Sequence, residues 1–304
     1  MEKIPSYIGR FAPSPTGELH FGSLITALAS YLRARSCHGK WLLRIEDLDF
    51  LRNQKNAAQK IIQTLLAHGL EWDDTIIYQS ERLEIYREYF YQMQKMQLIY
   101  PCSCSRKDLQ HHPINKETGE SVYLGTCQEK NHSYSEKISY RMKTENIEIS
   151  FRDFFQGNIK QNINNDVGDF IIWRKENFPA YQLAVVIDDA LQKVTEIVRG
   201  NDLLLQTPRQ IYLQQKLNFN LINYAHVPLA LNTFQQKLSK QNKAEPLNNN
   251  NAKENLKKAL KFLGMNENIV NEISAYSENS NVFLQHALTA FNFKDIPHKQ
   301  GVIF

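Results

Sequence analysis

The chain has 304 residues, with 36 Lys and Arg against 32 Asp and Glu, so its formal net charge is +4. Hydrophobic residues make up 42% and charged residues 22% of it, ordinary globular values that exclude wholesale disorder. No run approaches the ~20 apolar residues of a membrane-spanning helix, and the N-terminus lacks the pattern of a secretory signal. We therefore expect a cytoplasmic protein, outside any membrane, whose four cysteines are reduced or bound to metal.

The first hundred residues alternate between strand-like and helix-like patterns. Apolar residues recur at spacings of three and four where a helix is expected, and the residues of 40–46 fall into two alternating sets, as in a strand. Ser80 is expected to cap the third helix. In chain order, the pattern predicts a strand at 7–11, a helix at 24–32, a strand at 40–46 and helices at 58–66 and 83–93.

The character of the chain changes at Pro101, after which polar residues and three of the four cysteines follow. Strand-like runs return further on, and Thr207 and Pro208 are expected to be the N-cap and first residue of a helix. Strands alternating with helices at both ends predict an α/β fold, a Rossmann-type parallel sheet with an inserted α+β subdomain. The later elements expected are strands at 169–174 and 194–199, a flexible loop at 248–251 and helices at 254–263 and 283–291.

The organisation that follows has three parts. The expected parts are a catalytic core of residues 1–100 and 181–240, an inserted subdomain of residues 101–180 that carries zinc, and a short helical C-terminal tail of residues 241–304.

A proline-stiffened turn follows the first strand, and a helix start bearing His20, Gly22 and Ser23 follows the turn. Free N–H groups at a helix N-terminus attract phosphate, and Gly22 lets a ligand approach the backbone. The alternative is an ordinary β–α turn with a surface histidine. Far downstream, Lys237 and Lys240 flank Leu238-Ser239 in a polar loop, where they could neutralise a triphosphate or simply be solvated.

Together these two motifs resemble the HIGH and KMSKS signatures of the class I aminoacyl-tRNA synthetases, with Ser23 and Gln241 departing from them. The resemblance covers roughly residues 5–241 and is closest to the glutamyl branch, through the run Tyr181 to Arg209 that includes Asp188-Asp189 and Arg199-Gly200-Asn201-Asp202. It implies ATP with Mg²⁺, L-glutamate and a tRNA as partners. It also implies ATP-binding roles for His20, Gly22, Ser23 and Lys240, and catalytic roles for His20, Lys237 and Lys240.

The same resemblance implies a glutamate pocket. Arg10 or Arg199 would grip the side-chain carboxylate with a bidentate fork, and Glu46, opposite Ile45, suits the ammonium group. Taken alone, Glu46 could belong to a solvated acidic turn, and Tyr181 could be a core aromatic. The implied glutamate-binding residues are Arg10, Ser14, Glu46, Tyr181 and Arg199.

Cys102, Cys104 and Cys127 bring three sulfurs within 26 residues, a pattern that suggests one structural, tetrahedral Zn²⁺. The alternative is ordinary reduced cysteines. The family resemblance implies the phenolate of Tyr123 as the fourth ligand, while His111, His112 and His132 are rivals for that place. Cys37 is expected to be a packed residue.

About 60 residues follow Gln241, fewer than the helical anticodon-binding region of full-length glutamyl-tRNA synthetases. The chain therefore resembles the truncated paralogues of that branch, which transfer activated glutamate to the queuosine base of tRNA(Asp). We expect a monomer. The alternatives are a shortened conventional glutamyl-tRNA synthetase and a catalytically silent binding module on the same fold.

Overall fold

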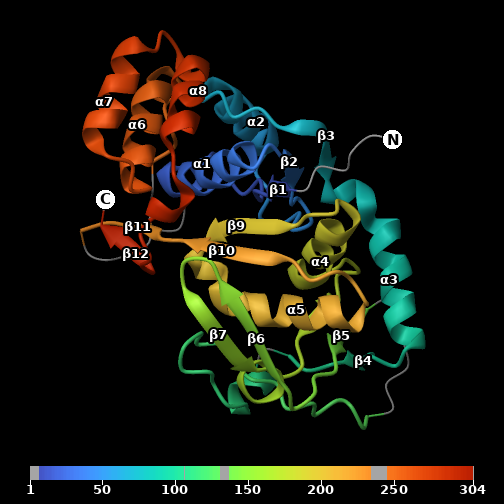
Figure 1. Cartoon of the computed structure of the whole chain (residues 1–304). Coiled ribbons are helices and arrows are strands. Elements are labelled where there is room, and N and C mark those ends of the chain that lie inside the picture. Colours follow the sequence, from blue (N-terminus) through green and yellow to red (C-terminus); the bar gives the residue numbers. More distant parts are fainter. Residues whose placement is uncertain (1–6, 106, 131–136, 234–244, 304) are drawn as a thin grey trace, which may run out of the picture.

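The protein is described from a computed structural model that covers residues 7–105, 107–130, 137–233 and 245–303 (Figure 1). Its helices are α1 (Phe21–Ser36), α2 (Ala57–Ala67), α3 (Leu83–Lys95), α4 (Tyr181–Leu191), α5 (Thr207–Lys216), α6 (Ala252–Phe262), α7 (Glu267–Tyr276) and α8 (Ser280–Ala290). Its strands are β1 (Ile8–Phe11), β2 (Lys40–Ile45), β3 (Asp73–Tyr78), β4 (Ile99–Cys102), β5 (Ser139–Met142), β6 (Glu148–Asp153), β7 (Gly157–Asn162), β8 (Ile171–Trp173), β9 (Glu196–Gly200), β10 (Asn223–Val227), β11 (Leu229–Leu231) and β12 (Gly301–Ile303).

Parallel strands form the centre of the molecule. β1 pairs with β2 and β2 with β3, while β9 pairs with β10 in a register that runs from Glu196–Asn223 to Gly200–Val227. β9 lies beside β1: just before β9, the Thr195 amide donates a hydrogen bond to the Ile8 carbonyl of β1 at 2.9 Å. The spatial order is therefore β3-β2-β1-β9-β10, which confirms the expected parallel α/β architecture.

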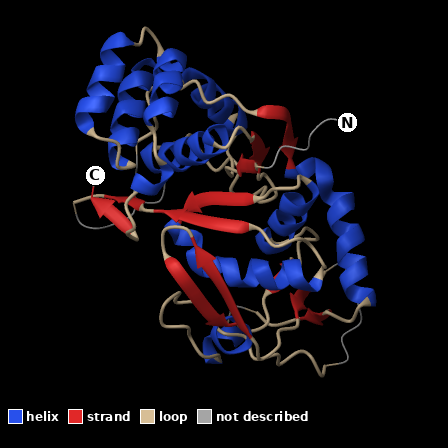
Figure 2. Ribbon diagram, viewed as in Figure 1, coloured by secondary structure: helices blue, strands red, loops and turns tan. Residues whose placement is uncertain are grey.

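Helices cover both faces of these strands, as Figure 2 shows. Along β9, Val198 faces a core shared with α1, whereas Ile197 faces a second core shared with α4 and α5. Along β10, Ala225 faces the core shared with α1, and Tyr224 faces the core shared with α4 and α5. A parallel sheet with both faces covered has strands that are buried throughout.

The point between β1 and β9 is where the connections change sides. The chain leaves β1 for α1 on one face, and leaves β9 through the 3₁₀ helix η4 (Asn201–Gln206) for α5 on the other (Figure 1). In open α/β sheets, ligands bind at the carboxyl ends of the strands at such a switch point.

The segment between α3 and α4 adds two further β structures. β4, β5 and β8 form a small antiparallel sheet, and β6 and β7 form an antiparallel hairpin. β6 also pairs in parallel with β10, at Asp153 and Tyr224, so the hairpin extends the central sheet. This pairing places Asp153 in contact range of the carboxyl half of β10.

The C-terminal helices pack on the core rather than apart from it. Leu256 and Leu260 of α6 and Phe283 of α8 share one buried cluster with Leu24 and Leu28 of α1. The helices expected at 254–263 and 283–291 are confirmed as α6 and α8, and α7 was not predicted. The expected loop at 248–251 contains a 3₁₀ turn at Asn249–Asn251.

Two local expectations are wrong. Ser80 does not cap α3: it lies in the 3₁₀ helix η1 (Gln79–Arg82), and its hydroxyl donates to Asp47 at 2.6 Å. Thr207 is the first residue of α5, after the N-cap Gln206. The strand expected at 40–46 is confirmed as β2, and Arg44 on its polar side is fully buried.

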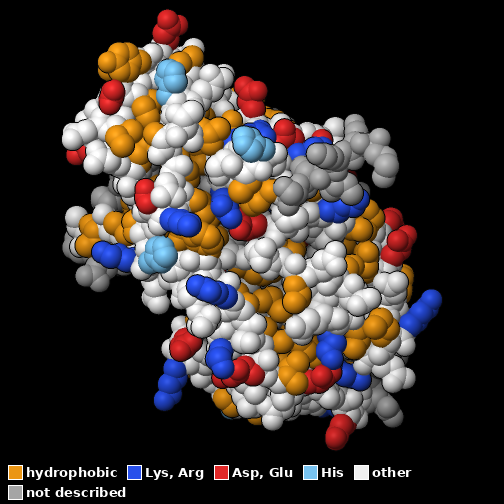
Figure 3. Space-filling model, in the orientation of Figure 1, with side chains coloured by type: hydrophobic (Ala, Val, Ile, Leu, Met, Phe, Trp, Pro, Cys, Tyr) orange, Lys and Arg blue, Asp and Glu red, His pale blue; other side chains and the backbone are white. Residues whose placement is uncertain are grey.

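Charged side chains are scattered over the face shown in Figure 3, where Lys and Arg are interspersed with Asp and Glu. This distribution fits a net charge of only +4. Among the described residues, no helix has the length and hydrophobicity that crossing a membrane would require.

Candidate active site

Arg10, near the carboxyl end of β1, is held in a buried ion-pair cluster. Its Nε and Nη2 donate to the two carboxylate oxygens of Asp189 on α4, at 3.1 and 3.2 Å. Arg44 donates from Nη1 to Asp189 at 2.8 Å and from Nη2 to Glu46 at 3.1 Å. Burial alone would raise the pKa of Asp189, but Arg10 and Arg44 hold it below its usual range.

The neighbouring Asp188 fastens a different part of the chain to α4. Its fully buried carboxylate accepts hydrogen bonds from Gln79 at 2.8 Å, Arg82 at 2.8 Å and Tyr86 at 2.7 Å. The Asp188-Asp189 pair therefore joins β1, β2 and the start of α3 to one helix. This pair is part of the family resemblance, but the sequence gives no signal of what either carboxylate does.

Arg199, near the carboxyl end of β9, has a different environment. Its Nε donates to Nε2 of His226 at 3.0 Å, and its Nη2 donates to Oγ1 of Thr207 at 2.8 Å. Its Nη1 is buried and has no hydrogen-bond partner among the described residues. Buried guanidinium N–H groups are rarely left unpaired, so this atom fits an anionic ligand.

Tyr181 is within electrostatic range of Glu46 and of both arginines. Glu46 follows β2 directly and is 9% exposed, whereas Tyr181, the first residue of α4, is 37% exposed. Burial around its hydroxyl and the Glu46 carboxylate raise the pKa of Tyr181, while Arg199 and Arg10 act in the opposite direction. The structure thus brings together four of the expected glutamate-binding residues, with one carboxylate and two guanidinium groups.

Ser14 lies in the loop after β1 and is exposed. The loop is tied to the chain after β2, because the Glu46 amide donates to the Pro13 carbonyl at 3.0 Å and the Gln54 amide to the Pro15 carbonyl at 2.9 Å. These bonds fix the position of Glu46 relative to the end of β1.

In this structure neither Arg10 nor Arg199 presents a free bidentate fork. The fork of Arg10 is occupied by Asp189. In Arg199, Nε and Nη2 are occupied by His226 and Thr207, so a ligand can reach this side chain only through Nη1. These protein partners lie far away in the sequence, so spacing within the motifs gives no signal of them.

The start of α1 carries the residues expected to bind phosphate. His20 is the N-cap, and its Nδ1 accepts a hydrogen bond from the Ser23 amide at 3.3 Å, so one of the N-terminal amides is capped by the protein itself. Gly22 and Ser23 lie half-buried in the first turn. Pro246 forms a β-bridge with His20, which brings the chain from Glu245 onward beside this turn. Lys237, Lys240 and Gln241 lie outside the described residues.

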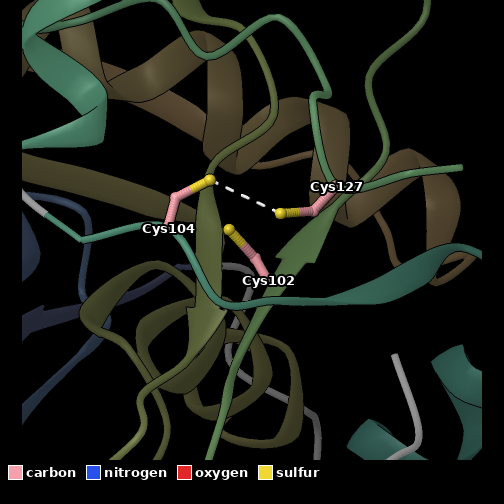
Figure 4. Close-up of side chains that lie close together, drawn as sticks. All are labelled: Cys102, Cys104 and Cys127. Atoms are coloured by element: carbon pink, nitrogen blue, oxygen red, sulfur yellow. Dashed lines mark hydrogen bonds between the residues drawn. The ribbon is translucent and has the colours of Figure 1, made fainter. Parts of the chain in front are cut away.

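The sulfur atoms of Cys102, Cys104 and Cys127 converge, as Figure 4 shows, and all three lie within 4.8 Å of one another. The hydroxyl of Tyr123 lies 3.4 Å from Sγ of Cys102 and 3.2 Å from Sγ of Cys104. Among the described residues, this cysteine cluster is the group of His, Cys, Asp and Glu side chains with the geometry to hold a metal ion.

The rival histidines are not part of that cluster where the structure describes them. The ring of His112 stacks on Tyr123 with centroids 4.8 Å apart, and its Nδ1 accepts from the Leu124 amide at 3.3 Å. His111 ends a short 3₁₀ helix, and its side chain does not join the cysteine cluster. His132 lies outside the described residues. Cys37 caps the end of α1 and packs against the core, as expected.

Arg141 of β5 provides a positive charge beside the cluster. Its Nε donates to Sγ of Cys102 at 3.1 Å, and its guanidinium lies 3.8 Å from the centroid of the Tyr123 ring. Burial raises the pKa of the Cys127 thiol, but hydrogen bonds with Tyr123 and Cys104 lower it overall, to about 6. A thiolate is therefore accessible at neutral pH, as a metal ligand requires.

Comparison with known proteins shows the family of the chain. Residues 8–297 match the family model of the class I tRNA synthetases (E and Q), catalytic domain. The chain is 46% identical over 259 residues to glutamyl-Q tRNA(Asp) synthetase of Dechloromonas aromatica, covering 85% of this chain and 86% of the relative. It is 47% identical over 264 residues to the protein of the same name from Neisseria meningitidis, covering 86% of this chain and 89% of the relative.

A solved structure shows the same fold. A glutamate tRNA ligase from Elizabethkingia meningosepticum, in complex with its amino acid, superposes with a TM-score of 0.80 at 22% identity, covering 98% of this chain and 67% of that protein. The chain therefore belongs to the class I tRNA synthetases of the E and Q type and, within them, to the glutamyl-Q tRNA(Asp) synthetase family.

Proposed function

We propose that this protein activates L-glutamate with ATP and transfers it to the queuosine base of tRNA(Asp). The observation that carries the proposal is the buried Arg199, whose Nη1 is unpaired and whose charge, like that of Glu46, acts on the hydroxyl of Tyr181. A cation for a carboxylate and a carboxylate for an ammonium group are what glutamate needs. The names of the relatives supply the tRNA and the queuosine specificity.

In the first step, an oxygen of the glutamate α-carboxylate attacks the α-phosphorus of ATP. A carboxylate–phosphorus bond forms, the bond to the β-phosphate oxygen breaks, and glutamyl-adenylate and pyrophosphate result. The nucleophile is already ionised, so no general base is needed, and catalysis consists of positioning and charge stabilisation. Mg²⁺ bound to ATP would offset part of the triphosphate charge.

The residues divide this work between them. Arg199 would bind the side-chain carboxylate, Glu46 the ammonium group, and Arg10, Ser14 and Tyr181 would complete the glutamate site. Among the ATP-binding residues, His20, Gly22 and Ser23 line the start of α1. Lys237 and Lys240 are proposed, from the family resemblance, to stabilise the charge that develops toward pyrophosphate.

In the second step, a hydroxyl of the queuosine cyclopentene ring attacks the carbonyl carbon of the adenylate. An ester bond forms, the hydroxyl gives up its proton to solvent, and AMP leaves with the electron pair of the broken carbon–oxygen bond. The glutamate is thereby attached to the modified base rather than to the 3′ end of the tRNA.

The transfer is tested with ATP, labelled glutamate and queuosine-containing tRNA(Asp), followed by nuclease digestion to locate the label. We expect the label in the anticodon fragment, and none on tRNA(Asp) that lacks queuosine. Label found only on the 3′ adenosine of tRNA(Glu) would identify a shortened conventional synthetase. Absence of any glutamate-dependent reaction would identify a silent module.

We also propose that Cys102, Cys104, Tyr123 and Cys127 hold one structural Zn²⁺. Tetrahedral zinc with Zn–S bonds of about 2.3 Å places its sulfur ligands roughly 3.8 Å apart, and the observed Cys104–Cys127 distance is 3.4 Å. Without metal, burial and the neighbouring thiols raise the pKa of Tyr123, so a phenolate ligand depends on the charge of the ion. Bound zinc would join the end of β4 to the segment around residue 127.

The zinc proposal predicts about one Zn per chain by elemental analysis. Cys104→Ser should lose the metal and become more sensitive to proteolysis around residues 102–127. Cys37→Ser is the matched control and should keep both the metal and the fold. A metal-free preparation that is fully folded and active would contradict the proposal.

The division into a catalytic core, an inserted subdomain and a C-terminal tail at the expected boundaries stays a prediction, as do the monomeric state and the cytoplasmic location.

A further inference from the structure

A buried relay runs from β6 through β10 to β9, behind Arg199. Nδ1 of His226 lies 2.6 Å from Oδ2 of Asp153, and Nε2 of His226 lies 3.0 Å from Nε of Arg199. All three side chains are at least 96% buried. Arg199 can only donate, so Nε2 of His226 must accept, and the histidine proton must lie on Nδ1, where it faces the carboxylate.

The aspartate is fixed by the backbone independently of the histidine ring. Its carboxylate accepts hydrogen bonds from the amides of Phe155 at 3.0 Å, Gln156 at 2.9 Å and His226 at 3.1 Å. It therefore stays ionised and selects the tautomer of His226. Burial and the charge of Arg199 lower the pKa of His226 to about 4, despite the opposite effect of Asp153, so the ring is neutral at pH 7.

Every described contact of the Arg199 guanidinium is with a neutral group. Besides His226 these are the Thr207 hydroxyl, the Leu203 carbonyl and the ring of Tyr224, whose centroid lies 5.4 Å away. Among the described residues, no carboxylate forms an ion pair with Arg199, in contrast to Arg10 and Arg44. Arg199 is thus oriented without having its positive charge cancelled by a direct partner.

We propose that His226 is a positioning residue for substrate specificity: as a neutral acceptor it fixes Arg199 with Nη1 unpaired and leaves the guanidinium charge to the side-chain carboxylate of glutamate. The inference rests on the proposed function, because it takes glutamate as the ligand. It predicts that the relay favours glutamate over glutamine, whose side chain has the same shape but no charge. A carboxylate in place of His226 would orient Arg199 equally well and would remove this preference.

Two conservative variants distinguish a role of His226 in orienting Arg199 from a role in filling space in the core. In His226→Gln the amide oxygen reaches the position of Nε2 and can still accept from Arg199. In His226→Asn the amide reaches only the position of Nδ1, so it keeps the contact with Asp153 and loses the contact with Arg199. His68→Gln is the matched control, because His68 is fully buried in contacts with Thr64 and Asn255.

The measurement is the Kd of glutamate and of glutamine by calorimetry, with thermal unfolding to check the fold. We expect His226→Asn to weaken glutamate binding by roughly 10- to 100-fold, as loss of a hydrogen bond to a charged group does, with little change for glutamine. His226→Gln should stay within about threefold of wild type, and His68→Gln should not change binding.

Equal effects of His226→Asn and His226→Gln, or an unchanged ratio of glutamate to glutamine affinity in His226→Asn, would overturn the inference. So would a wild-type protein that does not bind glutamate. If binding behaves as expected but no glutamate reaches queuosine-containing tRNA(Asp), the inference stands and the proposed function fails.

Discussion

Two buried arginines stand on adjacent strands at the switch point, and their surroundings differ. Arg10 on β1 shares the carboxylate of Asp189 with Arg44, so its charge is cancelled inside the protein. Arg199 on β9 donates a hydrogen bond to the neutral His226, and its Nη1 has no hydrogen-bond partner among the described residues. The difference teaches that one residue type can serve two tasks: Asp189 ties Arg10 to α4, whereas Arg199 is the residue proposed to bind the side-chain carboxylate of glutamate.

The largest effect is expected on the Arg10 side. Asp189→Asn should remove the carboxylate partner of the buried Arg10 and the shortest ion pair of Arg44, and destabilise the protein by about 3–5 kcal/mol. Denaturant unfolding measures this. The control is Asp74→Asn, which breaks the exposed pair with Lys40 and should cost less than about 1 kcal/mol. Similar small losses in both variants would show that the Arg10 cluster is not a structural joint.

Arg199→Lys should damage activity rather than the fold. A lysine keeps the charge but cannot donate to His226 and Thr207 while presenting a third group to substrate. We expect kcat/KM for glutamate-dependent ATP–pyrophosphate exchange to fall by about 100-fold, mainly through KM. Arg87→Lys, on the exposed side of α3, is the control and should behave like wild type. An unchanged KM in Arg199→Lys would remove Arg199 from the glutamate site.

The stability of the protein is also expected to depend on pH. The pKa of His226 is about 4 in the folded protein and about 6.5 when unfolded, so the unfolded chain binds the extra proton first as the pH falls. Stability should therefore be complete above about pH 6.5 and decline toward pH 4, by up to about 1.4 kcal/mol per unit for this group. Urea unfolding at several pH values should show a shallower decline in His226→Gln. Identical slopes would mean that His226 is not neutral in the native state.

Much of the fold and part of the site were predictable. The alternation of strands and helices predicted the parallel sheet, and the motifs picked out Arg10, Glu46, Tyr181 and Arg199, which the structure brings together. Their partners were not predictable. Asp189 lies 179 residues from Arg10 along the chain, and only the packing of α4 against β1 makes them neighbours.

The burial of β2 was missed for a related reason. Its alternating pattern is typical of a strand with one solvent-exposed face. Arg44 is nevertheless buried, and Asp189 and Glu46 neutralise its charge. A charged residue in a strand is expected to face solvent unless an oppositely charged partner is known. Here one such partner, Asp189, comes from a helix that is distant in the sequence. His226 was missed likewise, since a single histidine in a strand carries no signal of Asp153 on a neighbouring one.

The most direct test of the account is ATP–pyrophosphate exchange by the wild-type protein with glutamate and glutamine compared side by side. An uncompensated Arg199 predicts exchange that depends on glutamate and is at least about 100-fold less efficient with glutamine, because a buried cation would be left unpaired. Equal exchange with both amino acids, or faster exchange with glutamine, would contradict it.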